Sequence, residues 1–176
     1  MSLRPCVLVL CLLLAAARCW ADEALPACPA GLTPELVLQR LNALRAEPRP
    51  CGSVERAAAP ALRWDLRLAA AAEAYAGELA QRDTISHVGS QGRSLRERLG
   101  AAGYLMSSVG ENLAAGPEQL DDALQIWLAS AAHCQNLMAP ELVDAGLACV
   151  AAPGRYQRFW VLLLARSPRS SPDRSP

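Results

Sequence analysis

Apolar residues recur with helical spacing along most of the chain and change to short continuous runs near its end. Four helices are predicted: one starting at Thr33 and stopping before Pro48, one following Asp65 to about residue 82, one opening at Ser94, and one starting near residue 117. Their starts carry capping signals, above all the capping box Ser94-Leu-Arg-Glu97. The sequence therefore predicts helices over most of the chain before residue 140.

Two apolar runs after Pro140 have the length of strands. They span residues 142–151 and 156–165, and Pro153-Gly154-Arg155 between them is typical of a turn. Helices followed by an antiparallel hairpin predict an α+β fold in which the helices pack on an antiparallel sheet. The last residues, RSPRSSPDRSP, contain no apolar side chain, so residues 166–176 are predicted to be a disordered tail.

Length and charge narrow the class of protein. The 176 residues fit one domain. Seventeen arginines and no lysine are balanced by 17 acidic residues, and 52% of the residues are hydrophobic. This balance excludes a disordered chain and a strongly basic nucleic-acid-binding protein, so no nucleic-acid partner is expected. The sequence carries no signal for an oligomeric state.

Residues 1–21 have the features of a secretory signal peptide. Arg4 precedes an apolar run over residues 6–17, and Arg18-Cys19-Trp20-Ala21 follows it. Twelve helical residues reach about 18 Å, short of a hydrocarbon core of about 30 Å, so no stable membrane anchor is expected. The alternatives are a buried core helix, cleavage after Ala17, and a lipoprotein at Cys19, which the preceding Arg18 disfavours.

Cleavage after Ala21 leaves a formal charge of −2 and four cysteines: Cys28, Cys51, Cys134 and Cys149. In an exported chain four cysteines most simply form two disulfides, which predicts a periplasmic or extracellular protein. Zinc ligation by these cysteines is disfavoured because no C-x-x-C pair is present. Three pairings are open, and proximity along the chain favours Cys28–Cys51 with Cys134–Cys149.

The candidate chemistry lies in two histidines, His87 and His133, and in an acid between them. Glu111 belongs to an apolar, glycine-bounded segment, where an acid is expensive to bury without a partner. It is therefore expected to face a cleft or a partner. Three arginines near His87 alternate with Glu97 and are interpreted as a solvated helix face: Arg93, Arg96 and Arg98.

Three motifs follow in order: HVGSQGRS at 87–94, GENLAAG at 110–116 and WLASAAHCQNLM at 127–138. Together with LRWD at 62–65 and DAGLA at 144–148, they resemble the bacterial secreted branch of the CAP superfamily. That superfamily groups cysteine-rich secretory proteins, antigen 5 and pathogenesis-related proteins, and is also known by its SCP domain. The resemblance covers residues 33–165 and leaves residues 22–32 as an N-terminal segment.

This resemblance implies a three-layer α-β-α sandwich with a central antiparallel sheet and a shallow cleft that binds zinc or another divalent cation. By motif, His87, Glu111 and His133 take the metal-binding positions. The family's second acid follows a tryptophan by about three residues, and Ser130 stands there in this chain. Three ligands are therefore carried over. The resemblance also implies a Cys51–Cys134 disulfide, which leaves Cys28 to pair with Cys149.

The sequence leaves three hypotheses for the function of His87, Glu111 and His133. The leading hypothesis is a secreted protein whose cleft binds a divalent ion or a small ligand such as a lipid or peptide. The same three side chains would be catalytic in the alternative, a metal-assisted hydrolase of the peptidase kind. In the third, they form a polar network that joins helices to sheet in a structural or adhesive envelope module. A triad using Ser86, Ser90 or Ser107 is disfavoured because no G-x-S-x-G motif is present.

Overall fold

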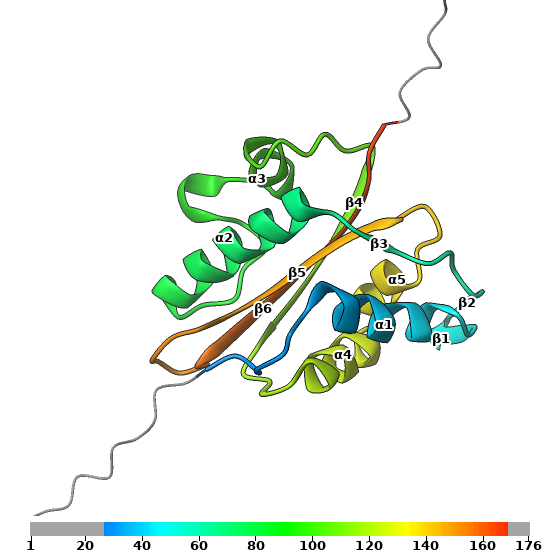
Figure 1. Ribbon diagram of the computed structural model, residues 1–176, viewed down its shortest axis with the longest axis horizontal. Coiled ribbons are helices and arrows are strands. Elements are labelled where there is room, and N and C mark those ends of the chain that lie inside the picture. Colours follow the sequence, from blue (N-terminus) through cyan, green and yellow to red (C-terminus); the bar gives the residue numbers. More distant parts are fainter. Residues whose placement is uncertain (1–26, 169–176) are drawn as a thin grey trace, which may run out of the picture.

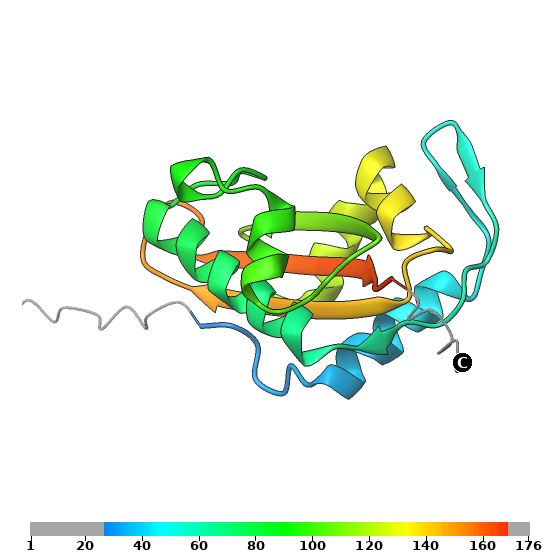
Figure 2. The same ribbon diagram turned by 90° about the horizontal axis from the view of Figure 1, so that it is seen from above.

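Five helices enclose a four-stranded sheet in three layers (Figures 1 and 2). The structure is a computed structural model, which describes residues 27–168. One face of the sheet carries α2 (Leu66–Arg82) and α3 (Leu95–Ala101). The other face carries α1 (Pro34–Arg45), α4 (Leu120–Ala129) and α5 (Ala131–Leu137). The predicted signal peptide and residues 169–176 of the predicted tail lie outside the described residues.

The sheet has the strand order β3-β5-β6-β4. The predicted hairpin is β5 (Asp144–Ala151) with β6 (Arg158–Arg166), paired antiparallel, and β4 (Ser108–Ala115) lies antiparallel on the other side of β6. A two-residue strand, β3 (Arg63–Trp64), runs parallel to β5. The predicted α+β sandwich is therefore confirmed, and its antiparallel sheet carries one short parallel edge.

Several elements had no prediction from the sequence, among them the short strand β3. The strand β4 forms from the segment that holds Glu111 and is buried over most of its length. A separate hairpin of β1 (Arg49–Cys51) and β2 (Val54–Arg56) stands apart from the main sheet (Figure 2). The short helix α5 follows α4 after a break at Ser130, which ends one helix and begins the next.

The helix starts form as the local sequence predicts. The Thr33 side chain accepts a hydrogen bond from the backbone N–H of Leu36, and Asp65 accepts from Leu68. At α3 the capping box is complete, because Glu97 accepts from the backbone N–H of Ser94 while the Ser94 hydroxyl accepts from that of Glu97. These contacts span two or three residues, so the sequence alone specifies them.

The core consists of two large hydrophobic clusters, one on each face of the sheet, and a small third cluster around Cys51 and Cys134. Alternate residues of β6 enter the two large clusters: Trp160 and Leu162 pack with α1 and α4, whereas Val161 and Leu163 pack with α2 and α3. Gly146 of β5 lets α2 approach closely, because a Cβ there would lie 2.2 Å from the backbone nitrogen of Ala69. Both faces are therefore buried, as continuous apolar runs require.

Two disulfides join distant segments. Cys28 pairs with Cys149 and Cys51 with Cys134, with Cα–Cα distances of 5.9 and 5.3 Å. This is the pairing that the family resemblance implies, and the pairing by sequence proximity is wrong. The first joins the N-terminal segment to β5, and the second joins the β1–β2 hairpin to α5. Among residues 27–168, no helix has the length and apolar character needed to cross a bilayer.

Candidate functional site

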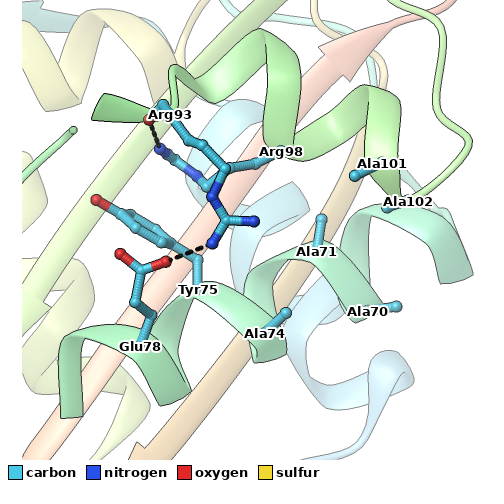
Figure 3. A pocket seen from close by; sticks show the side chains of 9 residues that line it. All are labelled: Ala70, Ala71, Ala74, Tyr75, Glu78, Arg93, Arg98, Ala101 and Ala102. Carbon is cyan, nitrogen blue, oxygen red and sulfur yellow. Dashed lines mark hydrogen bonds and ion pairs between the residues drawn. The ribbon is translucent and has the colours of Figure 1, made fainter. Parts of the chain in front are cut away.

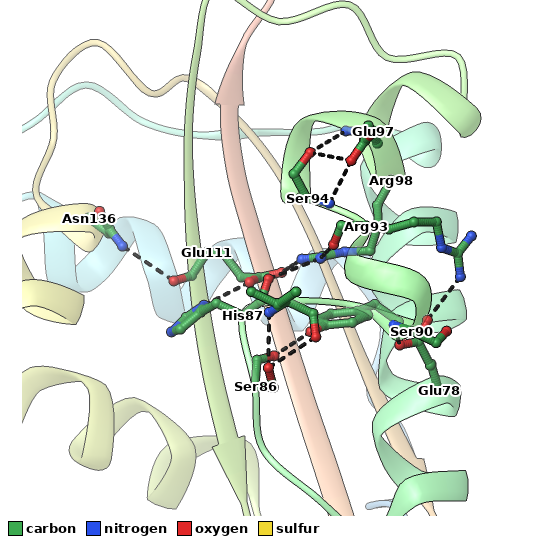
Figure 4. Close-up of polar contacts among 12 residues, drawn as sticks. Glu78, Ser86, His87, Ser90, Arg93, Ser94, Glu97, Arg98, Glu111 and Asn136 are labelled. Atoms are coloured by element: carbon green, nitrogen blue, oxygen red, sulfur yellow. Dashed lines mark hydrogen bonds and ion pairs between the residues drawn. The ribbon is translucent and has the colours of Figure 1, made fainter.

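His87 lies on the loop between α2 and α3, and several hydrogen bonds to backbone groups hold that loop (Figure 4). The Tyr75 hydroxyl donates to the carbonyl of Ser86, and Glu78 accepts from the backbone N–H of Ser90. Arg98 donates to the carbonyl of His87 at 3.1 Å. Side chains of α2 and α3 therefore hold the loop in place, although the loop has no regular secondary structure around His87.

Glu111 lies on β4 and has a partner on each carboxylate oxygen. Its Oε1 is 2.7 Å from Nδ1 of His87, and its Oε2 accepts a hydrogen bond from Arg98. The Glu111 side chain is only 3% exposed, whereas that of His87 is 59% exposed. An ionised carboxylate accepts from the Nδ1–H tautomer, which leaves Nε2 of His87 as the nitrogen with a free lone pair.

Arg98 is the charged partner of the buried Glu111 carboxylate. Its side chain is 6% exposed, and its guanidinium lies 3.5 Å from the centroid of the Tyr75 ring. The interpretation of Arg98 as part of a solvated helix face is therefore wrong. Helical spacing contained the signal for burial, since Arg98 shares the apolar side of α3 with Leu95 and Leu99.

The GEN motif, residues 110–112, connects the two faces of the sheet. Successive side chains of a strand point to opposite faces, and Asn112 donates to the carbonyl of His133 at 3.0 Å. Asn136 of α5 in turn donates to Oδ1 of Asn112 at 2.9 Å. A Cβ at residue 110 would lie 2.9 Å from the Asn136 side chain, which explains the glycine there.

His133 reaches the site from α5, on the other side of the sheet from α3. Its ring centroid lies 6.3 Å from that of His87, with the ring planes at 47°. The two imidazoles meet beside β4, which is the edge strand of the sheet. Burial, with a smaller contribution from His87, lowers the pKa of His133, so this ring is neutral at pH 7. Its Nδ1 is buried and has no hydrogen-bond partner.

The predicted metal ligands come together in space, but Glu111 has other partners. His87 is bonded to Oε1 and the buried Arg98 guanidinium to Oε2, so a cation at Glu111 would compete with one of these two partners. Within the described part of the chain, no group of three or more His, Cys, Asp or Glu side chains could hold a metal ion. The three side chains therefore do not form a three-ligand metal site in the structure as described, and Glu111 instead orients the His87 ring.

The hydroxyls considered for a catalytic triad have other partners. Ser86 Oγ accepts from the backbone N–H of Val88 at 3.0 Å, and Ser107 Oγ donates to the carbonyl of Arg166 at 3.1 Å. In the structure as described, His87 has no hydrogen bond to Ser86, Ser90 or Ser107. The arrangement thus supplies an oriented imidazole, and no serine is activated by it.

Replacing Glu111 by glutamine tests the buried ion pair. We expect Glu111→Gln to lower the free energy of unfolding by about 2–3 kcal/mol, because it leaves the Arg98 guanidinium buried without its carboxylate. Urea denaturation measures this change. The matched control is Glu55→Gln on the exposed β2 strand, which should change the stability by less than about 0.5 kcal/mol. Equal effects of the two substitutions would contradict a buried pair.

The fold and these motifs define a class of α-β-α sandwich proteins with a histidine–carboxylate site at the edge of the sheet. Residues 38–164 match the cysteine-rich secretory protein family, CAP. The chain belongs to this family.

Solved structures agree with this assignment. An extracellular protein containing an SCP domain from Bacillus anthracis str. Ames is 28% identical over 62% of this chain, with a TM-score of 0.55, and the match spans 35% of that protein. An outer surface protein from Borrelia burgdorferi is 21% identical, with a TM-score of 0.64, over 76% of this chain and 92% of the other. Comparison with curated protein sequences gave no match.

One further neighbour, NaASP2, was solved with Zn²⁺. It is 14% identical over 78% of this chain and 83% of its own, with a TM-score of 0.49. At this level of similarity the zinc is a property of NaASP2 alone.

Proposed function

We propose that this CAP-domain protein is exported by its N-terminal signal peptide and binds a divalent transition-metal ion such as zinc through His87 and His133. The observation that carries the proposal is the meeting of two imidazoles, 6.3 Å apart between centroids, where one ring is held by a buried carboxylate. Imidazole nitrogen is a preferred ligand of zinc and of related metals.

The hydrogen bond between His87 and Glu111 supports this role. A histidine that binds a metal commonly donates its other ring N–H to a carboxylate, which sets the tautomer and raises the basicity of the ligating nitrogen. Here Nδ1 of His87 faces Glu111, so Nε2 would be the ligand. Glu111 is therefore proposed as an orienting residue, which revises the three-ligand set expected from the sequence.

The separation of the two rings also fits a shared ion. Two imidazoles on one tetrahedral zinc, with bonds of about 2.0–2.1 Å, have centroids roughly 5 Å apart, about 1 Å closer than the distance between these rings. His87 is mostly exposed, so it can make this movement without disturbing the core. Two protein ligands leave the remaining coordination positions to water, which makes the proposed site weak and exchangeable.

Zinc titration by isothermal calorimetry tests the proposal. We expect one ion to bind wild type, and His87→Ala or His133→Ala to weaken binding by at least tenfold, because each removes half of the protein ligands. Glu111→Gln should weaken it by about 10- to 100-fold if the carboxylate orients His87. Ser130→Glu, which supplies an acid at the family's second acidic position, should strengthen binding.

The double variant His87→Ala/His133→Ala is the decisive control, since the chain has only two histidines. Heats equal to those of wild type would contradict the proposed site. If wild type binds no zinc while Glu111→Gln lowers the free energy of unfolding as expected above, the hydrogen bonds that join His87, Glu111 and Arg98 have a structural role only. The structural role is favoured by one observation, the saturation of both Glu111 oxygens by His87 and Arg98.

A further inference from the structure

A pocket of about 290 Å³ lies between α2 and α3 (Figure 3). It opens on the α2–α3 layer, and among its lining residues only Arg98 also contacts Glu111. Its apolar wall consists of alanines from both helices: Ala70, Ala71, Ala74, Ala101 and Ala102. The short alanine side chains leave space that larger side chains at these positions would fill.

The pocket has a polar end and an apolar end. Tyr75, Glu78, Arg93 and Arg98 gather at one end, and the alanines lie at the other (Figure 3). Such a layout matches a ligand with one polar group and one apolar body, because each part of that ligand meets a surface of its own kind.

The charged side chains at the polar end are paired, Glu78 with Arg93 and Arg98 with Glu111, so the hydrogen-bond donors that remain unused are what favour an anion over a cation. Glu78 already has several donors, since it accepts from Ser90, from Arg82 at 3.2 Å and from Arg93 at 3.0 Å. Arg98 already donates a hydrogen bond to Glu111. Arg93, in contrast, is 51% exposed and uses only Nη2 in the hydrogen bonds of the described side chains, while a guanidinium has five N–H donors.

We propose that this pocket binds a small amphiphilic monoanion, with its carboxylate on Arg93 and its apolar body on the alanine wall. A volume of about 290 Å³ is at the lower end of the range of about 300–1,000 Å³ for small-molecule pockets, so the ligand is small. This site is separate from the proposed metal site and does not depend on it.

Three eight-carbon probes with the same tail test the proposal: octanoate, octanol and octylammonium. Titration into the full chain, followed by ¹⁵N–¹H NMR, should show saturable octanoate binding with the largest shifts at residues of α2 and α3. Octanoate should bind about five- to tenfold tighter than octanol, because the carboxylate meets the Arg93 guanidinium with a full charge and two oxygens, whereas the octanol hydroxyl is a neutral acceptor. Octylammonium should bind more weakly than either.

Substitutions in the pocket supply the structural test. Ala74→Leu fills the space and should weaken octanoate binding at least tenfold, while leucine keeps the helix propensity of the site. The matched control is Ala43→Leu, an exposed alanine of α1, which should leave octanoate binding unchanged. Arg93→Gln should reduce the preference for octanoate over octanol to less than twofold, and Arg93→Lys should retain part of it.

Several results would overturn the proposal: equal affinities for octanoate and octanol in wild type, tighter binding of octylammonium, or equal effects of Ala74→Leu and Ala43→Leu. His87→Ala should keep full octanoate affinity. This variant separates the two sites, because it should weaken the proposed zinc binding at least tenfold and leaves the pocket intact.

Discussion

Replacing Arg45 by methionine should lower the free energy of unfolding by about 4 kcal/mol. The Arg45 side chain is fully buried, and its guanidinium donates to carbonyls at the junction of α1, α5 and the segment before β3. The acceptors are the carbonyls of Pro60 at 2.8 Å, Leu137 at 2.5 Å, Leu142 at 3.0 Å and Ala139 at 3.2 Å. Methionine would remove all of these hydrogen bonds, and of the four acceptors the carbonyl of Ala139 would keep another donor, the backbone N–H of Leu142 at 3.3 Å.

The charge of Arg45 is balanced by carbonyl dipoles, since no described carboxylate forms an ion pair with it. Burial lowers the pKa of Arg45 to about 10, with Glu141 opposing the shift, so the guanidinium remains charged at pH 7. The control is Arg40→Met on the same helix. Arg40 is half exposed and lies 3.5 Å from an exposed Asp121, a pair that contributes about 0–1 kcal/mol.

Urea denaturation of both variants measures the difference. Arg45→Lys should recover only part of the loss, because an ammonium group has three donors and cannot reach all four carbonyls. A loss for Arg45→Met no larger than that for Arg40→Met would show that the buried hydrogen bonds add nothing to the stability of the fold.

Removing the Cys51–Cys134 disulfide should lower the free energy of unfolding by about 4–5 kcal/mol, on the chain-entropy estimate for a loop of this length. The two cysteines are 83 positions apart and almost fully buried. The variant is Cys51→Ala/Cys134→Ala, compared with wild type by thermal and urea unfolding. Because Cys134 follows His133 on α5, the variant should also weaken zinc binding.

Cys28→Ala/Cys149→Ala is the matched comparison. Its cysteines are 121 positions apart, so chain entropy alone predicts a slightly larger loss. We expect only about 2 kcal/mol, because breaking this bond releases only the short segment before α1, and that segment gains freedom while the rest stays folded. A larger loss here than for Cys51–Cys134 would contradict this account.

Local interactions explain why most elements could be predicted. The Ser94–Glu97 capping box, the Asp65 cap and the 142–165 hairpin each depend on residues close together in sequence. The strand β4 was missed because its polar pair, Glu111 and Asn112, looks unlike a buried strand. Both side chains are buried only because partners arrive from other elements, Arg98 from α3 and Asn136 from α5.

The candidate site was also predicted in part from the sequence and completed only by the tertiary structure. The family motifs indicated that His87, Glu111 and His133 belong together, and the structure places them around one edge of the sheet. The motifs did not indicate that Arg98 would take one oxygen of Glu111. Helical spacing places Arg98 on the apolar side of α3, but only the packing of α3 in the folded chain brings its guanidinium to Glu111 while Arg93 stays half exposed.

The amino-acid sequence determined four of the described helices, the hairpin, the four cysteines that follow residue 21 and the three polar residues of interest, because periodicity, caps and motifs are local properties. The tertiary structure decided between the open cysteine pairings, placed the two histidines from opposite layers beside β4, and alone showed that Glu111 is neutralised by Arg98. The physical reason is that a buried charge needs a partner within a few ångströms in space, and only the packing of distant segments determines which side chain supplies it.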